Sequence, residues 1–319
     1  MVAPIINIAA KTMGIILAYG LSFFLSSVNF SGTAFIASDY QHKVEFFKPA
    51  IKKLLKSGVD TSFIYSLLSN KETKFNERFV KINITGYLKK VDYSFNYNAY
   101  SVRKTKEFIN ENLDMLQRCE QTYHVPKEVI AALLWVETKH GSILGESNVA
   151  SVFMSTAMAD QPQFIRLNKR TLREEFTGDT SELHELEKKI ASRATKKSDW
   201  AVRELVALSK MEKQKKINVR NLRGSWAGAF GLSQFLPSSY VKFAVDGNGD
   251  GKIDLFVLDD AVYSVANYLK KNGWEDAPES HEKALYAYNN SSAYVSAILK
   301  LAGKVSTNNT TKKAEEKQL

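Results

Sequence analysis

The chain has 319 residues, of which 44% are hydrophobic and 24% charged, so collagen-like, disulfide-scaffold and wholly disordered classes of protein are excluded. The 44 lysines and arginines outnumber the 34 aspartates and glutamates, and the net charge of +10 favours a polyanionic partner such as nucleic acid, anionic lipid or an acidic cell-wall polymer. The single cysteine, Cys119, excludes an internal disulfide and a multi-cysteine metal site. We interpret Cys119 as a small helix residue.

The first 38 residues have the pattern of a targeting segment. Residues 12–38 contain no charged side chain, and Lys11 supplies positive charge directly before them. The apolar residues 15–28 fit the hydrophobic region of a signal peptide, and small residues at 32–34 offer a cleavage site. An uncleaved membrane anchor is the alternative, because the uncharged stretch is long enough to span a bilayer. Either interpretation predicts an exported protein of the periplasm or cell envelope, and export argues against a nucleic-acid partner.

Residues 39–118 are predicted to form an N-terminal helical region. Apolar residues recur there at three- and four-residue spacing, with a break at Ser57 and Gly58. Residues 84–100 are rich in tyrosine and asparagine and have a less regular pattern. A further helix is expected to follow them and to continue as far as Tyr123.

The next helix is predicted between Pro126, which suits a first helical turn, and Gly141, which suits a helix end. Its apolar stripe includes Ile130 and Leu133, and Glu137 continues the same face. Burial raises the pKa of a carboxyl group, and an acid that stays protonated near neutral pH can protonate a leaving group. Glu137 is therefore a candidate general acid. The alternative is that it merely ends the stripe and is partly solvated.

Two segments after this helix stand out by composition. Residues 165–220 are highly charged and helical in pattern, as expected of a solvated insertion or of a cap over a cleft. Residues 224–240 interleave small and aromatic residues, so the backbone could approach a ligand closely while Ser225 and Gln234 bind its hydroxyl or amide groups. The alternative for this segment is a tightly packed crossing of a helix and a loop. It lacks the glycine-lysine ending of a phosphate-binding loop.

An acidic loop follows at residues 246–254, where oxygen-bearing side chains alternate as in the first nine positions of a calcium loop. Gly251 stands at the sharp turn. Val257 occupies the twelfth position, where a glutamate is usual, and Asp260 could close an enlarged loop instead. Alternate spacing brings oxygens to one centre, where a hard cation offsets their repulsion. We predict a structural cation, calcium or another, in preference to a solvated turn, and no organic cofactor.

The C-terminal part has two further features. Tyr288, Asn289 and Tyr294 lie in a segment whose aromatic residues recur at helical spacing, and by itself this spacing indicates core packing. Residues 304–319 lack an apolar stripe that could pack on a core, and they are predicted to form a disordered tail. The sequence contains no internal repeat.

Together these residues resemble the membrane-bound lytic transglycosylase B family, glycoside hydrolase family 103. The match covers roughly residues 120–303, with weaker similarity from about residue 40. The matching motifs, in the family's order, are V-E-T at Glu137, G-S-W-A-G-A at 224–229, Q-F-x-P-S-S-Y at 234–240, V-D-G-N-G-D-G-K-I-D at 245–254, D-A-x-x-S-V-A-N-Y-L at 260–269 and Y-N-x-S-x-x-Y at 288–294. Chance does not place so many separate motifs in one order.

The resemblance implies a mainly α (α+β) protein in which residues 119–303 form a lysozyme-like catalytic domain. It implies cleavage of the β-1,4 bond between N-acetylmuramic acid and N-acetylglucosamine in peptidoglycan, leaving 1,6-anhydromuramic acid ends. The partner would be the glycan strand, and a monomer is expected. By the same resemblance Glu137 is catalytic, and the substrate-binding residues are Ser225, Gln234, Tyr288, Asn289 and Tyr294. The implied ligands of the structural cation are Asp246, Asn248, Asp250, Lys252 through its carbonyl, and Asp260.

Three departures from the family pattern concern the outer sugar subsites. His140 stands where an aromatic residue commonly precedes the glycine of the family's E-T-x-x-G stretch. The tyrosine-proline-arginine-arginine segment expected after the catalytic helix is not recognisable in residues 157–166. The charged segment that follows is longer than usual for the family. These departures leave the glycan preference open.

A single acid suits the implied reaction, because a transglycosylase uses the substrate's own hydroxyl group as nucleophile. Attack by water would instead call for a second carboxylate at a defined separation. We expect Glu137 to protonate the glycosidic oxygen and then to take the proton from the muramyl 6-hydroxyl, while the substrate's N-acetyl carbonyl, held by Ser225 or Asn289, stabilises the positive intermediate. The alternatives are a lysozyme-type hydrolase that uses the same glutamate and a non-catalytic wall-binding protein.

Overall fold

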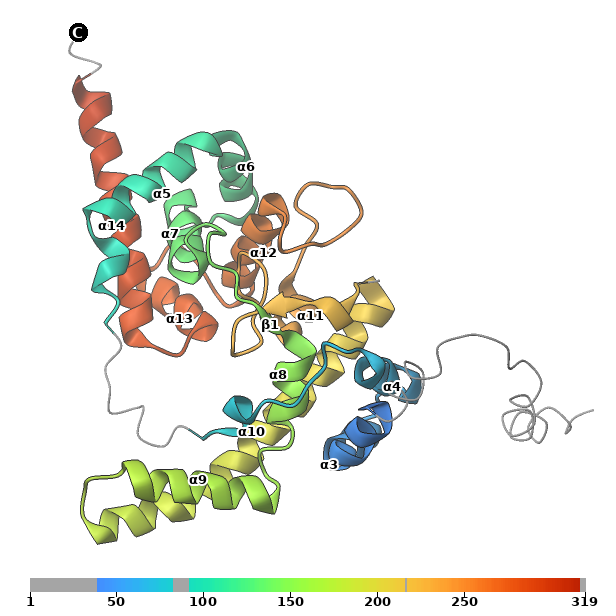
Figure 1. Cartoon of the computed structure of the whole chain (residues 1–319). Coiled ribbons are helices and arrows are strands. Elements are labelled where there is room, and N and C mark those ends of the chain that lie inside the picture. Colours follow the sequence, from blue (N-terminus) through green and yellow to red (C-terminus); the bar gives the residue numbers. More distant parts are fainter. Residues whose placement is uncertain (1–38, 83–91, 216, 316–319) are drawn as a thin grey trace, which may run out of the picture. The chain divides into compact units, whose positions relative to one another are not determined.

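The computed structural model describes residues 39–82, 92–215 and 217–315, and these are mostly helical (Figure 1). The chain divides into two units between Glu45 and Phe46, and the helices and strands named below belong to the second unit. Its α-helices are α3 (Lys48–Lys56), α4 (Thr61–Ser69), α5 (Ala99–Glu111), α6 (Leu113–Tyr123), α7 (Lys127–Thr138), α8 (Val149–Thr156), α9 (Pro162–Glu175), α10 (Thr180–Lys215), α11 (Pro237–Phe243), α12 (Leu258–Lys271), α13 (Pro278–Tyr288) and α14 (Ser292–Glu315).

Shorter elements connect these helices. The 3-10 helices are η1 (Glu77–Val80), η3 (Ser94–Tyr97) and η4 (Val219–Asn221). Strands β1 (Ser147–Asn148) and β2 (Arg223–Gly224) pair antiparallel, with Ser147 opposite Gly224. This short pair joins the start of α8 to the glycine-rich segment. The predicted fold class, mainly α with a small β element, is confirmed.

Helix α7 is the central helix of one group, because it is apolar on nearly every side. Residues 129–135 are all buried, and α5, α6, α12 and α14 pack against the helix (Figure 1). A helix that is apolar all round requires neighbours on every face. This enclosure fixes the C-terminal turn of α7, which carries Glu137.

Helix α7 ends in a left-handed turn. Lys139 and His140 have φ values of 52° and 55°, and Gly141 follows with a φ of 93°. The ring of His140 stacks on Phe108 with 3.9 Å between ring centroids, and its Nε2 lies 2.9 Å from the carbonyl oxygen of Ala131. Burial lowers the pKa of His140 to about 4, so the neutral ring fills the place where the family pattern has an aromatic residue.

Residues 165–220, predicted to be a charged insertion or cap, form most of α9 and the long helix α10. Helix α10 packs against α3, α8, α9 and α11, and Ile190 and Leu205 on it are fully buried. Lys53 of α3 contacts both Asp160 (2.5 Å) and the Ser198 hydroxyl (2.7 Å). The segment is thus an integral part of the fold. The many charged residues made its apolar stripe difficult to recognise in the sequence. That stripe is buried against helices that lie far away in the sequence.

Two predicted boundaries differ from the structure. The boundary between residues 118 and 119 falls inside α6, and residues on both sides belong to one compact unit. The predicted disordered tail is wrong for residues 304–315, because α14 continues to Glu315. Val305 is fully buried, and Lys304 Nζ donates a hydrogen bond to the Tyr97 carbonyl (2.9 Å). A helix anchored by such contacts propagates beyond its apolar stripe.

The targeting segment predicted at residues 1–38 lies outside the described residues. Within the part of the chain that the structure describes, no helix combines the length and the apolar character that crossing a membrane requires. The signal peptide and the membrane anchor therefore both stay predictions.

Candidate active site

Glu137 is half-buried in the last turn of α7. Its Oε1 accepts a hydrogen bond from the hydroxyl of Tyr294 (2.5 Å) on α14. Burial raises the pKa of Glu137 to about 7, although the Tyr294 hydrogen bond and the positive charge of Lys139 both act to lower it. Glu137 is consequently a carboxylic acid that keeps its proton close to neutral pH, the property expected of a general acid.

Tyrosines surround this carboxyl group. Tyr294 is buried, and its ring lies 6.5 Å from that of Tyr288 and 6.1 Å from that of Tyr93, measured between centroids. Burial, reinforced by the nearby Glu137 carboxylate, raises the pKa of both Tyr288 and Tyr294 well above the ordinary value. These hydroxyls therefore stay neutral and act as hydrogen-bond donors at any pH near 7.

Two residues of this site were missed by sequence reasoning. Tyr93 lies close enough to Glu137 for that carboxylate to raise its pKa, after the larger effect of burial. Its tyrosine-rich segment was noticed, but nothing in its pattern indicated contact with α14. Lys139 adopts a left-handed conformation, and its Nζ donates hydrogen bonds to Asn96 and to the Trp135 carbonyl. The V-E-T-K-H run gave no signal that the chain would turn back there.

The glycine-rich segment is fastened to the end of α7. Thr138, next to Glu137, donates a hydrogen bond from Oγ1 to the Leu232 carbonyl (3.0 Å), and Tyr288 donates one from its hydroxyl to the Ser233 carbonyl. The backbone of Gln234 has a φ of 49°, and its Nε2 donates to the carbonyls of Leu144 (3.3 Å) and Gly231 (3.0 Å). The structure therefore brings the Gln234 loop to the candidate acid.

Ser225 stands at the other end of the same loop. Its Oγ accepts a hydrogen bond from the Ala229 backbone N–H (3.2 Å), and its own N–H donates to the Ala229 carbonyl (2.7 Å). Gly228 has a φ of 83°, and a side chain there would lie 2.4 Å from the ring of Phe153 on α8. A glycine is thus required at this crossing, which agrees with the interpretation of the segment as a packed crossing, while its role as a binding loop stays a prediction.

Asn289 differs from the other predicted site residues. It is exposed at the C-terminal end of α13, directly after Tyr288. Its carbonyl accepts a hydrogen bond from the Ser291 backbone N–H (2.7 Å), and it takes no part in the hydrogen bond between Glu137 and Tyr294. The structure therefore assembles Glu137, Tyr288 and Tyr294 directly, whereas Asn289 lies at the edge.

The acidic loop is a tight structure closed by its own carboxylates. Asp246 accepts hydrogen bonds from the backbone N–H groups of Gly249 (2.6 Å) and Gly251 (2.8 Å), both of which have positive φ. The buried Asp260 accepts them from Gly247 (2.8 Å) and Asp254 (2.6 Å), so it ties α12 to both ends of the loop. The oxygen-only character of this loop suits a hard cation.

The side chains of the acidic loop do not converge on one point. Over the described residues, no three histidine, cysteine, aspartate or glutamate side chains converge as a metal-binding group. Asp250 accepts the backbone N–H of Lys252 (2.8 Å), and Asn248 accepts that of Asp250 (3.0 Å). The predicted ligands thus lie in the closed loop and, for Asp260, at the start of α12, and they are oxygen ligands of the type that calcium prefers. The side-chain oxygens of Asp246, Asn248, Asp250 and Asp260 accept hydrogen bonds from backbone N–H groups.

Cys119 is buried on α6, where burial raises the pKa of its thiol to about 12. A thiol with so high a pKa is unreactive at neutral pH, because the thiolate is the nucleophilic form. The interpretation of Cys119 as a small helix residue is confirmed.

The fold and the site define a class of mostly helical proteins that hold one shielded glutamic acid among tyrosines. Within that class, the chain belongs to the transglycosylase SLT domain family, whose domain matches residues 45–283. A curated relative, the membrane-bound lytic murein transglycosylase B of Escherichia coli (strain K12), is 33% identical over 167 residues. The matched region makes up 52% of this chain but only 37% of that relative. The resemblance drawn from the sequence motifs is confirmed.

Solved structures with the same fold extend this result. The soluble lytic transglycosylase SltB1 of Pseudomonas aeruginosa aligns with a TM-score of 0.60 at 19% identity, over 84% of this chain and 99% of SltB1. The Escherichia coli lytic transglycosylase Slt35 in complex with calcium gives 0.57 at 22%, over 85% and 94%. SltB3 of Pseudomonas aeruginosa in complex with NAG-NAM-pentapeptide gives 0.59 at 19%, over 84% and 80%. These likenesses establish the fold.

Proposed function

We propose that the chain is a peptidoglycan lytic transglycosylase. It would cleave the β-1,4 bond between N-acetylmuramic acid and N-acetylglucosamine and leave 1,6-anhydromuramic acid ends. The observation that carries the proposal is Glu137, a carboxyl group whose pKa of about 7 is set by burial and which is held by Tyr294 inside the family's domain. The name of the Escherichia coli relative, a lytic murein transglycosylase, gives the substrate class.

Glu137 would act first as an acid and then as a base. Because the Tyr294 hydroxyl donates to Oε1, the acid proton belongs on Oε2, from which it passes to the glycosidic oxygen as the C–O bond breaks. The Glu137 carboxylate then removes the proton of the muramyl 6-hydroxyl while that oxygen bonds to the anomeric carbon. Glu137 thus donates one proton and recovers one proton, so no second carboxylate is needed.

The remaining site residues would bind the sugars. Ser225 and Gln234 would contact the sugars from the glycine-rich loop, and Asn289 would do so from the end of α13. Tyr294 holds the acid, and Tyr288 holds the neighbouring loop. We assign the N-acetyl group of the reacting sugar to Ser225 or Asn289, because a hydroxyl and an amide can both bind its carbonyl group.

We further propose that the acidic loop binds calcium. The solved Slt35 complex contains calcium, and the loop of this chain offers only oxygen ligands. The ligands would be Asp246, Asn248, Asp250, the Lys252 carbonyl and Asp260. The cation would supply positive charge that offsets the repulsion of these carboxylates, so its role is to stabilise the loop.

The last part of the proposal is the location of the enzyme, which we propose to be exported. The predicted signal peptide or anchor at residues 1–38 would deliver the enzyme to the periplasm or cell envelope, where peptidoglycan lies, and the relative's name describes it as membrane-bound. The net charge of +10 suits the acidic peptides and polymers of a cell wall. A monomer suffices for the site, because Glu137, Tyr93, Tyr288 and Tyr294 come from one chain.

The masses of released fragments test this function. Purified peptidoglycan is digested with the protein, and the soluble muropeptides are analysed by mass spectrometry. We expect 1,6-anhydro products, which are lighter by one water than the products of hydrolysis. Hydrated ends would indicate the lysozyme-type alternative, and binding to sacculi without soluble fragments would indicate a wall-binding protein.

A further inference from the structure

A second groove lies apart from Glu137, between α8, α9, α10 and η1. It has a volume of about 810 Å³, within the range of ligand pockets. Four cationic side chains line it, namely those of Arg78, Lys81, Arg193 and Lys197, against the single carboxylate of Glu175. The groove is therefore strongly positive in a limited space, which favours a ligand with several carboxylates.

One of these cations, Lys197, is held by a backbone carbonyl of the opposite wall. Lys197 of α10 donates a hydrogen bond from Nζ to the carbonyl oxygen of Lys81 (2.7 Å), so α10 and the end of η1 form facing walls. Asn168 of α9 fixes the same wall, because its amide donates to the Val80 carbonyl (3.0 Å) and accepts from the Ile82 N–H (2.7 Å). The positive groove is thus built by η1 together with α9 and α10, and these two helices belong to the charged segment that the family pattern did not explain.

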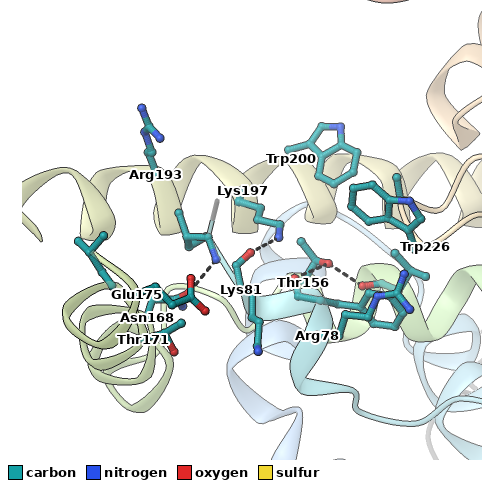
Figure 2. Close-up of a pocket in the computed structure, with 15 residues that line it drawn as sticks. Arg78, Lys81, Thr156, Asn168, Thr171, Glu175, Arg193, Lys197, Trp200 and Trp226 are labelled. Atoms are coloured by element: carbon teal, nitrogen blue, oxygen red, sulfur yellow. Dashed lines mark hydrogen bonds between the residues drawn. The ribbon is translucent and has the colours of Figure 1, made fainter. Parts of the chain in front are cut away.

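Tryptophans occupy the other end of the groove. In the view of Figure 2, Trp200 and Trp226 stand at one end and Glu175 at the opposite end, with Lys197 between them. Trp226 is 65% exposed and lines the groove, so its ring is available to contact a ligand there. Trp200 is braced from beneath by Phe153, at 5.4 Å between ring centroids.

The same loop connects this groove to the candidate active site. Trp226 and Ala227 line the groove, while Leu232 of the same loop accepts the Thr138 hydrogen bond beside Glu137. A glycan strand bound at Glu137 would therefore run past Trp226. Its substituents could then enter the groove.

We propose that this groove binds the acidic stem peptide of peptidoglycan, with Arg78 and Lys81 as the accessible cations that contact the peptide carboxylates. This proposal rests on the proposed function, since it places the peptide of the same substrate. Guanidinium and ammonium groups bind carboxylates by charge-assisted hydrogen bonds, and the tryptophan rings provide an apolar surface for the peptide backbone. The groove would thereby favour strands that still carry peptides.

The test compares peptide-bearing peptidoglycan strands with strands from which an amidase has removed the peptides. The variant carries Arg78→Gln and Lys81→Gln, two exposed positions that take no part in the site around Glu137. Its control carries Lys270→Gln and Lys271→Gln, which remove the same charge from the exposed end of α12. Thermal unfolding of each variant confirms that both remain folded.

We expect the groove variant to raise KM about fivefold or more on peptide-bearing strands, with kcat unchanged, as the loss of two exposed charge pairs predicts. On peptide-free strands KM should equal that of the wild type, and the control should change neither value. Equal increases on both substrates would show that the groove holds the glycan itself, and no increase would show that it holds neither; each result overturns the proposal. Direct binding of soluble strands with and without peptides is measured alongside by isothermal titration calorimetry. A wild-type protein that cleaves neither substrate contradicts the proposed function. The groove proposal is tested separately, by whether removal of the peptides weakens the binding of the strands to the protein.

Discussion

Opposing effects set the pKa of Glu137. Burial disfavours the ionised form and raises the pKa to about 7, while the Tyr294 hydroxyl and the charge of Lys139 favour the ionised form. A residue that must donate a proton and later recover it needs a pKa near the working pH, because a stronger or weaker acid performs one of the two steps poorly. The hydrogen bond from Tyr294 therefore keeps the pKa of Glu137 lower than burial alone would make it.

Replacement of Tyr294 by phenylalanine should move the pH dependence of cleavage. Loss of the hydrogen bond to ionised Glu137 raises its pKa further, so the decline of kcat/KM above about pH 7 should shift upward by about one pH unit. The sign follows because the protonated form is the active acid. Tyr123→Phe on α6 is the control. A profile that stays at the wild-type position would show that Tyr294 does not influence the acid.

At the scale of elements, the loop from Gly224 to Phe235 depends on one close approach. Gly228 combines a φ of 83° with a contact to Phe153 that leaves no room for a methyl group. Because the loop is also bonded to α7 through Thr138, displacement at Gly228 would be felt at both Ser225 and Gln234.

The variant Gly228→Ala should lower the free energy of unfolding by about 1–3 kcal/mol, because its backbone would be strained, and it should also reduce the rate of cleavage. Gly303→Ala is the matched control, because a side chain there meets nothing within 4 Å and its helix should gain about 0.5–1 kcal/mol. Differential scanning fluorimetry and turnover of peptidoglycan measure both. If Gly228→Ala were as stable and active as Gly303→Ala, the loop would not be fixed as described.

The acidic loop makes a separate prediction about calcium. A free calcium concentration of about 100 times Kd should add about 2.7 kcal/mol to stability, which corresponds to a rise of several degrees in Tm, and a chelator should reverse it. The variant Asp250→Asn should lose most of this response, while Asp259→Asn, outside the predicted ligand set, should keep it. A Tm that is identical with calcium and with chelator would exclude a structural cation in this loop.

At the scale of the whole molecule, the sequence predicted local features better than long-range partners. Glu137 on an apolar helix, the break at Ser57 and the helical position of Cys119 were accessible because they depend on the local sequence pattern. The contact between Tyr93 and Tyr294 was not, since it joins segments that only the fold brings together. The burial of α10 was missed for the same reason, as a 36-residue helix rich in charge conceals a stripe that packs on α3, α8 and α11.

Membership of the transglycosylase SLT domain family and the geometry of the acid support one account at this scale. The helices around α7 position a single carboxyl group, and the glycine-rich loop, which carries the proposed sugar-binding residues Ser225 and Gln234, is bonded to the end of α7. The groove between η1, α9 and α10 is the proposed surface for the peptide. We therefore propose that Glu137 performs the chemistry and that the elements on either side of it set the selectivity.

The central claim is that one carboxyl group delivers and recovers the proton, and the cleavage rate of Glu137→Gln tests it most directly. Peptidoglycan digestion by this variant is compared with that by Glu128→Gln, a change on the same helix in a residue paired with Lys127 (3.2 Å). At pH 8 the Glu137 variant should be at least as stable as the wild type, because the buried ionised carboxylate is gone, so inactivity cannot be ascribed to unfolding. We predict that Glu137→Gln lowers kcat/KM by at least about 10²–10⁴-fold while Glu128→Gln stays near the wild-type rate. Release of anhydro products by Glu137→Gln at the wild-type rate would contradict the account.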